Sequence, residues 1–517
     1  REAAAGGKAD EEYEVAVVGA GPAGYVMAHL LAERHGRSVC LIDPNASKPW
    51  PNNYGVWQDE WDALEDKLQL GLQECLGTQW DVTDCYFGGS WDMPVDDLQR
   101  LDRKYARVER NKLKAKLVSP KIKVINEGWS GQVVATNVYA GGLFHDAEGS
   151  TLTLSSGKTV RAKLIVDCTG AESKLTRRVA AAGESSTPLA GYQIAYGFAG
   201  IIEGDIHYKP EAMTLFDYRT DHLSIDPAWE KRAEEFPTFM YVMPLGKVPG
   251  ESNAQKVFFE ETSLVARPAM SFEECKKRCF RRLEFHGLKI RPGSIEEEEF
   301  CYIPMGGELP EPNQRVVAFG GAAAMVHPST GYQLCRMLAA SSDVAATIGQ
   351  QLEEPGVSPD AVAGAAYDAI WSQKNQGQRA FAIFGGELLM EFDVESLRGW
   401  FQGFFELPTD MWGGFLAGWP GLPGNKLHET WYERLWFGLN LVVKLPGPVT
   451  FQLVKGILGF TLTYGFSLFR SVTPIFGQPP SYLWEAPTPE DQIGDVPAKK
   501  EAMAMIAEAR KKEKVGA

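Results

Sequence analysis

The segment from Tyr13 to Asp43 constrains the fold more than any other part of this 517-residue chain. Val15 to Val18 is a short apolar run that predicts a buried strand, and Val39 to Ile42 predicts a second one. Between them, Ala23 to Glu33 is rich in Ala and Leu and predicts a helix. A strand, a glycine-rich turn, a helix and a strand in this order are typical of the first unit of a nucleotide-binding α/β domain.

Three glycines, Gly19, Gly21 and Gly24, form the pattern G-x-G-x-x-G between the first strand and the helix. The first permits a tight turn, the second lets backbone N–H groups approach a pyrophosphate, and the third lets the helix pack closely on the strand. The helix N-terminus favours an anion there. Asp43 follows Gly24 by 19 residues, where an acid accepts hydrogen bonds from a ribose. The pattern predicts a dinucleotide site but does not separate FAD from NAD. The alternative is a glycine-rich loop in an ordinary α/β protein.

Charge and cysteine content exclude some functions. The net charge of −15 argues against a nucleic-acid partner. The eight cysteines include no C-x-x-C pair, so no metal site is predicted. Cys275 and Cys279 are expected to be exposed thiols on a helix, and a reducing compartment fits best. Because the chain begins at Arg1 rather than Met, we expect a processed form that lacks its targeting peptide.

Strand-like and helical stretches alternate in a way that indicates two interleaved domains. Tyr105 to Val118 is basic and amphipathic and predicts one helix with Arg110 near its start. The return of the chain to the nucleotide sheet after a strand-rich region argues for two domains that share one cleft. The predicted divisions are a disordered N-terminus (1–12), a nucleotide-binding domain with a β-meander (13–190), a β-rich substrate domain (191–310), a return to the nucleotide-binding domain (311–379), a helical region (380–485) and a charged tail (486–517).

From Ala380 onward the chain becomes rich in Phe, Trp, Leu and Gly. Val449 to Phe469 approaches the length of a membrane span but contains Gln452 and Lys455, and a span needs roughly 20 apolar residues. We therefore expect helices that lie in the membrane interface with Trp and Phe toward the lipid. The alternative is a buried helical subdomain.

Several stretches resemble the plant- and alga-type lycopene cyclases, flavoproteins of the plastid that form carotenoid rings. The resemblance implies an α/β fold, with a Rossmann-like FAD-binding domain interleaved with a β-sheet-rich substrate domain and a helical, aromatic-rich, membrane-associated C-terminal region. The resembling stretches are PNNYGVW (51–57), YARVERNKL (105–113), GYQIAYG (191–197), PTFMYVMP (237–244), FFEETSLVARP (258–268), YIPMGG (302–307) and MVHPSTGY (325–332).

The same resemblance implies an activity, a cofactor and partners. The family contains beta and epsilon cyclases and relatives that make xanthophyll end groups. The segment 263–268, Met305 and Ser329 resemble the beta type, whereas Tyr302 and the segment 379–385 are closer to epsilon. The beta reading implies conversion of the ψ ends of lycopene, or of a monocyclic carotene, to β-ionone rings. It also implies reduced FAD as cofactor, NADPH as an indirect reductant, contact with plastid membrane lipid and association with other carotenoid enzymes.

The resemblance also carries binding residues onto this chain. Gly19, Gly21, Gly24 and Asp43 match the family's dinucleotide motif, and Arg110 matches an arginine that related flavoproteins direct at the cofactor. Gly320-Gly321 falls where many flavin monooxygenases carry Gly-Asp on the ribityl chain. Here Gly321 replaces the acid, so that contact is in doubt.

The acid needed for cyclisation is expected at Glu260 and Glu261. A proton adds at C2 of the ψ end, a cation develops at C5, the ring closes and a proton leaves C6. Adjacent residues on a strand point to opposite faces, so only one of the two carboxyls can enter the cleft. Burial beside Phe would raise its pKa and keep it protonated. The resemblance implies that this pair carries the acid role; the alternative is a strand end with two solvated acids.

Two further sites and two further functions stay open. His327 is a candidate base or flavin contact, although a lone loop histidine is more often structural. Asp217 and Arg219 are either a second acid with its partner or a turn pair. An FAD monooxygenase acting on an isoprenoid substrate, which would consume NAD(P)H and O₂, and a non-catalytic flavin-binding scaffold on a membrane are the competing functions.

Overall fold

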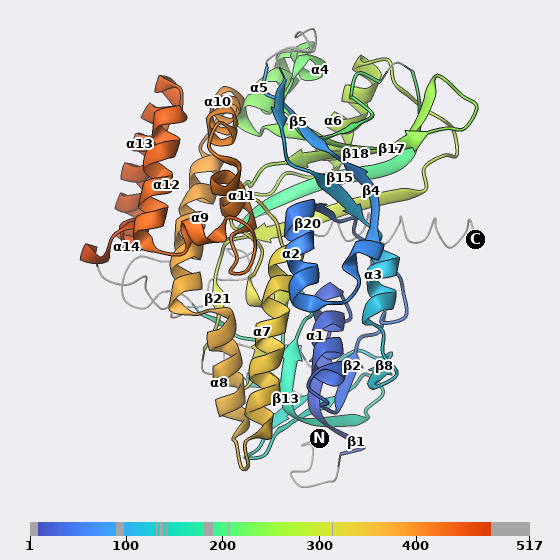
Figure 1. Ribbon diagram of the computed structural model, residues 1–517, viewed down its shortest axis with the longest axis vertical. Helices are drawn as coiled ribbons and strands as arrows, with labels where there is room; N and C mark the ends of the chain where they lie inside the picture. Colours follow the sequence, from blue (N-terminus) through green and yellow to red (C-terminus); the bar gives the residue numbers. More distant parts are fainter. Residues whose placement is uncertain are drawn as a thin grey trace.

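A computed structural model describes residues 9–88, 98–130, 132–134, 138–140, 142–179, 190–204, 206–312 and 314–476. Figure 1 shows a nucleotide-binding domain at the bottom, a second sheet at the top and C-terminal helices along the left edge. The predicted charged tail lies outside the described residues. Of the predicted disordered N-terminus, residues 1–8 also lie outside them, but Glu11 and Glu12 already belong to the first strand, so for these two residues the prediction was wrong.

The nucleotide-binding domain contains a seven-stranded sheet in the order β11-β12-β13-β1-β2-β8, with β22 paired to β13. Val15 lies opposite Val39 on one side and Leu164 on the other, both in parallel register. The predicted strands and helix of the first unit are confirmed. The strands are β1 (Glu11–Val18), β2 (Val39–Ile42), β8 (Ile122–Ile125), β11 (Leu143–His145), β12 (Ser150–Thr153), β13 (Thr159–Asp167) and β22 (Val316–Ala318).

Helices α1 (Pro22–Glu33) and α7 (Leu334–Glu353) pack together in the core of this domain, beside the parallel strands (Figure 1). Both helices expose few side chains because apolar residues cover most of their surface. Smaller elements complete the domain: α2 (Gln58–Leu68), α3 (Arg110–Leu117), α8 (Pro359–Ile370), the pair β9 (Gln132–Val134) and β10 (Val138–Ala140), and the pair β14 (Arg178–Val179) and β21 (Leu309–Pro310).

The helix predicted over 105–118 is wrong in its first turn. Residues Tyr105–Val108 form strand β7, which pairs with β3 (Gly55–Trp57) and with β4 (Leu76–Trp80). Both backbone edges of the strand are hydrogen-bonded, and three of its four side chains are buried. These tertiary contacts outweigh the local amphipathic pattern, and the helix begins at Arg110.

The second sheet has eight strands in the order β19-β15-β18-β17-β16-β5-β6, with β20 paired to β15. Strands β5 and β6 come from the sequence range assigned to the first domain, so the chain crosses between the two sheets earlier than its pattern indicates. The strands are β5 (Val82–Tyr86), β6 (Gln99–Leu101), β15 (Gly191–Glu203), β16 (Ala212–Asp217), β17 (Thr238–Lys247), β18 (Ala254–Ser263), β19 (Lys289–Ile290) and β20 (Glu297–Met305).

Helix α6 (Phe272–Phe285) packs on one face of this sheet, with the short helices α4 (Asp221–Ser224) and α5 (Pro227–Glu235) beside it. Cys275 and Cys279 lie on the covered side of α6 and are fully buried. The expectation of exposed thiols is therefore wrong, because a four-residue spacing places both on the helix face that meets the sheet.

The C-terminal region divides into two parts. Helices α9 (Gln373–Met390), α10 (Val394–Phe405) and α11 (Thr409–Ala417) pack against the second sheet in one apolar cluster. Phe401 of α10, for example, stacks on Phe216 of β16 with ring centroids 4.7 Å apart. For these three helices the buried-subdomain alternative is correct.

Helices α12 (Trp431–Lys444), α13 (Gly447–Tyr464) and α14 (Ser467–Val472) lie at the outer edge of the molecule (Figure 1). One side of α13 is buried and the other side is apolar but exposed. Within the described part of the chain, no helix combines the length and the apolarity needed to cross a membrane.

Candidate active site

A cavity of 680 Å³ opens at the carboxyl ends of β1 and β2. Ligands of open α/β sheets bind at this edge, where the turn after the first strand meets the next helix. The wall combines that turn with the end of β2, the turn after β13 and the start of α7; it includes Gly19, Gly21, Asp43, Tyr54, Thr169, Gly321 and Gln333.

The three glycines of the turn occupy the positions that the predicted pattern requires. Gly19 has φ +104°, and a Cβ atom there would lie 2.4 Å from the Cys168 carbonyl oxygen. A Cβ atom on Gly24 would lie 1.8 Å from the Gly19 carbonyl oxygen, so helix and turn touch directly. A Cβ atom on Gly21 would meet no protein atom within 4 Å, because Gly21 faces the cavity. These are the three roles of a pyrophosphate-binding turn.

Asp43 is fixed on the cavity wall by backbone hydrogen bonds. Its Oδ2 accepts from the Ala20 N–H at 2.9 Å, and its Oδ1 accepts from the Asn45 N–H at 2.6 Å. A carboxylate has about four acceptor positions, so positions remain for ribose hydroxyls. The turn and this acid together fit the adenosine-diphosphate half of a dinucleotide.

The other predicted cofactor residues differ in their position. Gly321 lines the cavity, whereas Gly320 packs on α1, since a Cβ atom there would lie 2.7 Å from Ala23 Cβ. Arg110 is not among the lining residues. Its guanidinium donates to Asn53 Oδ1 at 2.9 Å and pairs with Glu297 at 3.3 Å.

Glu261 points to the face of the second sheet that α6 covers. Its side chain is fully buried, and its carboxylate accepts two hydrogen bonds from Arg282 at 2.9 and 3.1 Å. Thr238 Oγ1 donates a third hydrogen bond at 2.6 Å. Charge-assisted hydrogen bonds of this kind are strong and engage both carboxylate oxygens, so Arg282 of α6 holds the Glu261 side chain in place.

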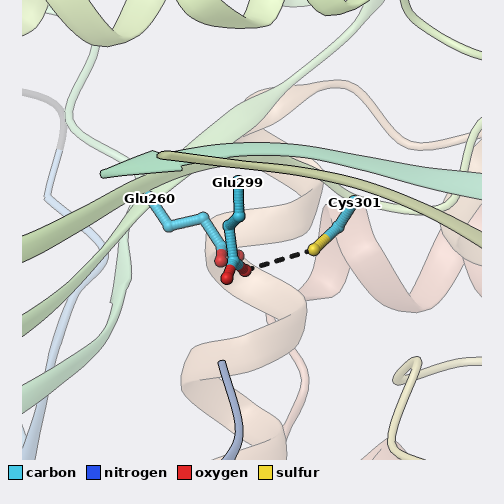
Figure 2. Close-up of side chains that lie close together, drawn as sticks. All are labelled: Glu260, Glu299 and Cys301. Atoms are coloured by element: carbon cyan, nitrogen blue, oxygen red, sulfur yellow. Dashed lines mark hydrogen bonds between the residues drawn. The ribbon is translucent and has the colours of Figure 1, made fainter. Parts of the chain in front are cut away.

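Glu260 points to the opposite face, toward the nucleotide-binding domain. Thr262 Oγ1 donates to its Oε1 at 2.9 Å. Figure 2 shows its carboxyl beside that of Glu299. One carboxyl oxygen of Glu260, one of Glu299 and the sulfur of Cys301 all lie within 4.8 Å of one another. Burial, followed by the charge of Glu299, raises the pKa of Glu260 well above its ordinary value. Burial and the neighbouring carboxyl group therefore both favour the protonated form of Glu260.

A glycine in the central strand allows the two carboxyls to meet. Gly197 of β15 lies opposite Glu260 on one side and opposite Glu299 on the other. A Cβ atom on Gly197 would lie 2.8 Å from the Phe258 ring and 3.2 Å from Glu260 Cγ. The space over Gly197 is therefore filled by side chains of the neighbouring strand, and the glutamates converge across it.

The loop before β3 connects this carboxyl pair to the cofactor cavity. The backbone and side-chain N–H groups of Asn53 both donate to Glu299 Oε2 at 2.8 Å. Cys301 Sγ donates to Glu299 Oε1 at 3.2 Å (Figure 2). The next residue along the loop, Tyr54, lines the cavity.

Aromatic side chains lie near Glu260. Tyr241 lies opposite Glu260 in the register of β17, and its hydroxyl donates to the Tyr105 hydroxyl at 3.1 Å. The Tyr105 ring meets the Trp57 ring edge-on with centroids 4.9 Å apart. Aromatic faces stabilise a cation in an apolar site.

Comparison with known proteins identifies the family of this chain. The profile of one protein family, described as "Lycopene cyclase protein", matches residues 14–423. The chain belongs to the lycopene cyclase family. The lycopene beta cyclase of Arabidopsis thaliana, named as chloroplastic, is 37% identical over 434 residues, which cover 83% of this chain and 77% of that protein.

A second relative and one solved structure extend the comparison. The capsanthin/capsorubin synthase of Citrus sinensis is 35% identical over 409 residues, which cover 78% of this chain and 74% of that protein. The crystal structure of a geranylgeranyl bacteriochlorophyll reductase-like protein from Thermoplasma acidophilum has a TM-score of 0.51 at 16% identity and covers 75% of this chain and 90% of that one. The likeness shows a shared fold and confirms the predicted mixed α/β architecture.

The two remaining candidates from the sequence, His327 and Asp217, are both buried. His327 is buried; its Nδ1 accepts from the Ser329 N–H at 3.2 Å, and burial followed by the Arg336 charge lowers its pKa well below the ordinary value. Asp217 is fully buried and forms a bidentate pair with Arg219 at 2.7 and 2.9 Å. Burial acts to raise the pKa of Asp217, but the Arg219 charge outweighs it and lowers the pKa to about 2. Asp217 is therefore ionised and not a proton donor.

The sequence analysis missed Glu299, Gly197 and Asn53. Each lies in or beside a stretch that resembles the family, but none carries a local pattern typical of catalysis. Glu299 was one of four consecutive glutamates, and only the register of β15 with both neighbours brings it to Glu260.

Proposed function

We propose that this lycopene cyclase converts the ψ ends of lycopene to β rings with Glu260 as the proton donor. The main support for this proposal is the difference between the surroundings of Glu260 and Glu261. Glu261 is bound by Arg282 on the α6 side of the sheet, whereas Glu260 lies on the other side beside a second carboxyl group, where burial and the charge of Glu299 raise its pKa well above the ordinary value. Protonating an alkene requires a positioned carboxylic acid of this kind.

The reaction assigns a role to each part of the cleft. Glu260 gives its proton to C2 of the ψ end, which leaves a cation at C1. The C5=C6 π bond then attacks C1, so that the C1–C6 bond forms and the cation moves to C5, and loss of the C6 proton completes the β ring. The aromatic rings of Tyr241, Tyr105 and Trp57 offer π faces to the cation. The surrounding apolar cluster excludes water that would otherwise capture it.

FAD is the proposed cofactor, held by Gly19, Gly21 and Asp43 at its adenosine-diphosphate half and by Gly321 farther along the cavity. When bound and reduced, a flavin supplies negative charge that stabilises a nearby cation without net redox. NADPH is proposed as the indirect source of reducing equivalents. Arg110, engaged by Asn53 and Glu297, would act on the cofactor through the loop that contains Tyr54.

A plastid membrane is the proposed location. The outer surfaces of α12 and α13 expose a set of large apolar side chains, which we call the apolar edge: Trp431, Tyr432, Leu435, Trp436, Leu439, Val442 and Val443 of α12, and Phe451, Val454, Leu458 and Leu462 of α13. Helices with exposed Trp, Phe and Leu bind the membrane interface. A carotene partitions into lipid, so an enzyme at that interface gains access to its substrate; association with other carotenoid enzymes is proposed at the same membrane.

Expression in cells that accumulate lycopene tests the reaction. We expect β-ring products, and the purified enzyme with chemically reduced FAD should form them without O₂. Epsilon rings or xanthophyll end groups would instead place the chain with the other members of its family, and hydroxylated products with NAD(P)H and O₂ consumption would identify a monooxygenase.

A glycine variant tests the cofactor site. Gly21→Val should abolish flavin binding, because the new side chain fills the space that the pyrophosphate needs. Gly364→Val is a matched control, since a Cβ atom at Gly364 also meets no atom within 4 Å but lies on α8 away from the cavity wall. Retention of full flavin absorbance by Gly21→Val would refute the site.

Charge substitutions test the apolar edge. Val443 is 82% exposed and Leu462 is 88% exposed, so Val443→Asp with Leu462→Asp should fold normally and reduce sedimentation with liposomes. Ile225→Asp is the control, because Ile225 is 66% exposed but lies beside α4 on another part of the molecule. Equal sedimentation of all three proteins would mean that the apolar edge does not bind lipid.

A further inference from the structure

We propose that Glu299 is the ionised partner of Glu260 in a carboxyl pair that holds one proton, and that Glu299 thereby keeps the acid loaded and stabilises the cation once the proton has left. The inference rests on the proposed function, because it concerns the acid of that reaction. Glu299 is a positioning residue in this proposal: it acts on the substrate through Glu260 and through its charge.

The register of three neighbouring strands brings the two carboxyl groups together. The two glutamates belong to strands separated by β15, and both face the same side of the sheet opposite Gly197. Their carboxyl oxygens nevertheless lie within 4.8 Å of each other. Two carboxylates at this separation do not both ionise at neutral pH, so the pair retains one proton.

Hydrogen bonds decide which member is ionised. Glu299 accepts from two N–H groups of Asn53 and from the Cys301 thiol, which favours its charged form. Glu260 accepts a hydrogen bond from Thr262, and its hydrogen bond with Glu299 raises its pKa. The proton therefore resides on Glu260.

The titratable groups around Glu260 and Glu299 are either neutral or paired with another residue. Burial and the Glu299 charge raise the pKa of the Cys301 thiol, and burial raises the pKa of the Tyr241 and Tyr54 phenols, so these groups are neutral. The nearby arginines are engaged by Glu297, which pairs with Arg107 at 2.7 Å and with Arg110 at 3.3 Å. The titratable or charged groups that face the pair are Cys301 and Glu297 on β20, Tyr241 on β17, Tyr54 in the loop before β3, Arg107 on β7 and Arg110 on α3.

Over one reaction the carboxyl pair loses one proton and recovers one proton. Glu260 gives one proton to C2, and the pair then carries two negative charges next to a cation, which lowers the energy of the charged intermediate. Loss of the C6 proton neutralises the cation, and the pair recovers one proton. No external proton, electron or co-reactant is needed.

The pH dependence of cyclisation by the reduced, FAD-loaded enzyme tests the partner role. Activity should fall as pH rises through the pKa of Glu260. Glu299→Gln removes the negative charge, lowers the pKa of Glu260 and should shift this alkaline limb to lower pH by about 1–2 units. Glu299→Asp keeps the charge and should keep the limb close to that of the wild type.

A control variant on the same strand separates failure of the partner role from failure of the proposed function. Glu298→Gln removes a carboxylate from the same strand but from the opposite face, where Glu298 pairs with Lys276 at 2.6 Å, and should leave the limb unmoved. An unmoved limb in Glu299→Gln, with Glu260→Gln still inactive, overturns the partner role while the proposed function stands. Absence of ring products from the wild type overturns the proposed function itself.

An infrared measurement keeps the proposal testable if Glu299→Gln does not fold. The difference spectrum between the wild type and Glu260→Gln at neutral pH should contain the C=O band of one protonated carboxyl group. Absence of that band would show that Glu260 carries no proton and would overturn the one-proton pair.

Discussion

The two faces of strand β18 use the same residue type for opposite purposes. On the face covered by α6, Glu261 meets Arg282 and Thr238 in a dry, fully paired cluster. On the face toward the nucleotide-binding domain, Glu260 meets a second carboxyl group and aromatic rings. One peptide bond separates a carboxylate bound by arginine from the proposed acid.

The difference shows that the partner, rather than burial, sets the role of a carboxyl group. Glu261 is fully buried and Glu260 is partly buried, and removal from water by itself disfavours ionisation. Arg282 binds the Glu261 carboxylate through two hydrogen bonds, whereas burial and the neighbouring charge of Glu299 raise the pKa of Glu260. The predictions below test the two faces separately.

Glu260→Gln should have the largest effect. Loss of a general acid typically lowers the rate by about 10²–10⁴-fold, and the amide keeps the shape of the side chain. Ring formation from lycopene with reduced FAD is the measurement, and flavin absorbance should stay unchanged. Wild-type turnover in this variant would move the acid to another residue.

Glu261→Gln should primarily destabilise the fold. Removing one partner of a buried ion pair typically costs about 3–5 kcal/mol, because the other charge stays buried without compensation. A lowered urea midpoint would show this, whereas residual folded enzyme should still respond to pH like the wild type. The double variant Glu261→Leu with Arg282→Met should regain part of the loss; equal midpoints for wild type and Glu261→Gln would contradict the structural role.

Low pH should lower the free energy of unfolding through protonation of Asp217, on the sheet face that α6 covers. The Asp217 carboxylate lies 3.9 Å from Arg282 and pairs with Arg219. Its folded pKa of about 2 lies below the ordinary value of 3.8, so its stabilisation is present above pH 3.8 and is lost as pH falls toward 2. This shift corresponds to about 2 kcal/mol. Urea midpoints between pH 5 and pH 2.5 should fall more steeply for the wild type than for Asp217→Asn; parallel curves would remove Asp217 from the acid response.

Two threonine variants give the smallest and most selective contrast. Thr262 donates to Glu260 and favours its ionised form, so Thr262→Val should raise the pKa of Glu260 and shift the alkaline limb upward by less than about 1 unit. Thr238→Val removes the corresponding hydrogen bond on the other face and should lower the urea midpoint without moving the limb. A limb shift in Thr238→Val would show that the two faces are coupled.

The nucleotide-binding turn could be predicted from sequence because its parts are local. Gly19, Gly21, Gly24 and Asp43 lie within one strand–helix–strand unit, and each performs a task that its residue type defines. The alternation of Glu260 and Glu261 was equally local. Which of them enters the cleft was not, since it depends on where α6 packs.

The rest required long-range register. Nothing near Glu299 in the sequence indicates that β15 brings it to Glu260, and nothing near Tyr105 indicates that two strands will pair with it. The aromatic C-terminal region shows the same limit. Its composition is similar throughout, yet α9–α11 are buried and the apolar edge is exposed, because burial depends on which surface is left for each helix to cover.

The loop before β3 has a thermodynamic consequence. Asn53 donates to Glu299 and the adjacent Tyr54 forms part of the cofactor cavity, so one short segment contacts both sites. Any displacement of this segment by a bound cofactor changes the hydrogen bonds that hold the charge on Glu299. Binding linkage is reciprocal, so the protonation state of the carboxyl pair must then alter cofactor affinity by the same factor. Flavin titrations at different pH values would measure that coupling free energy directly.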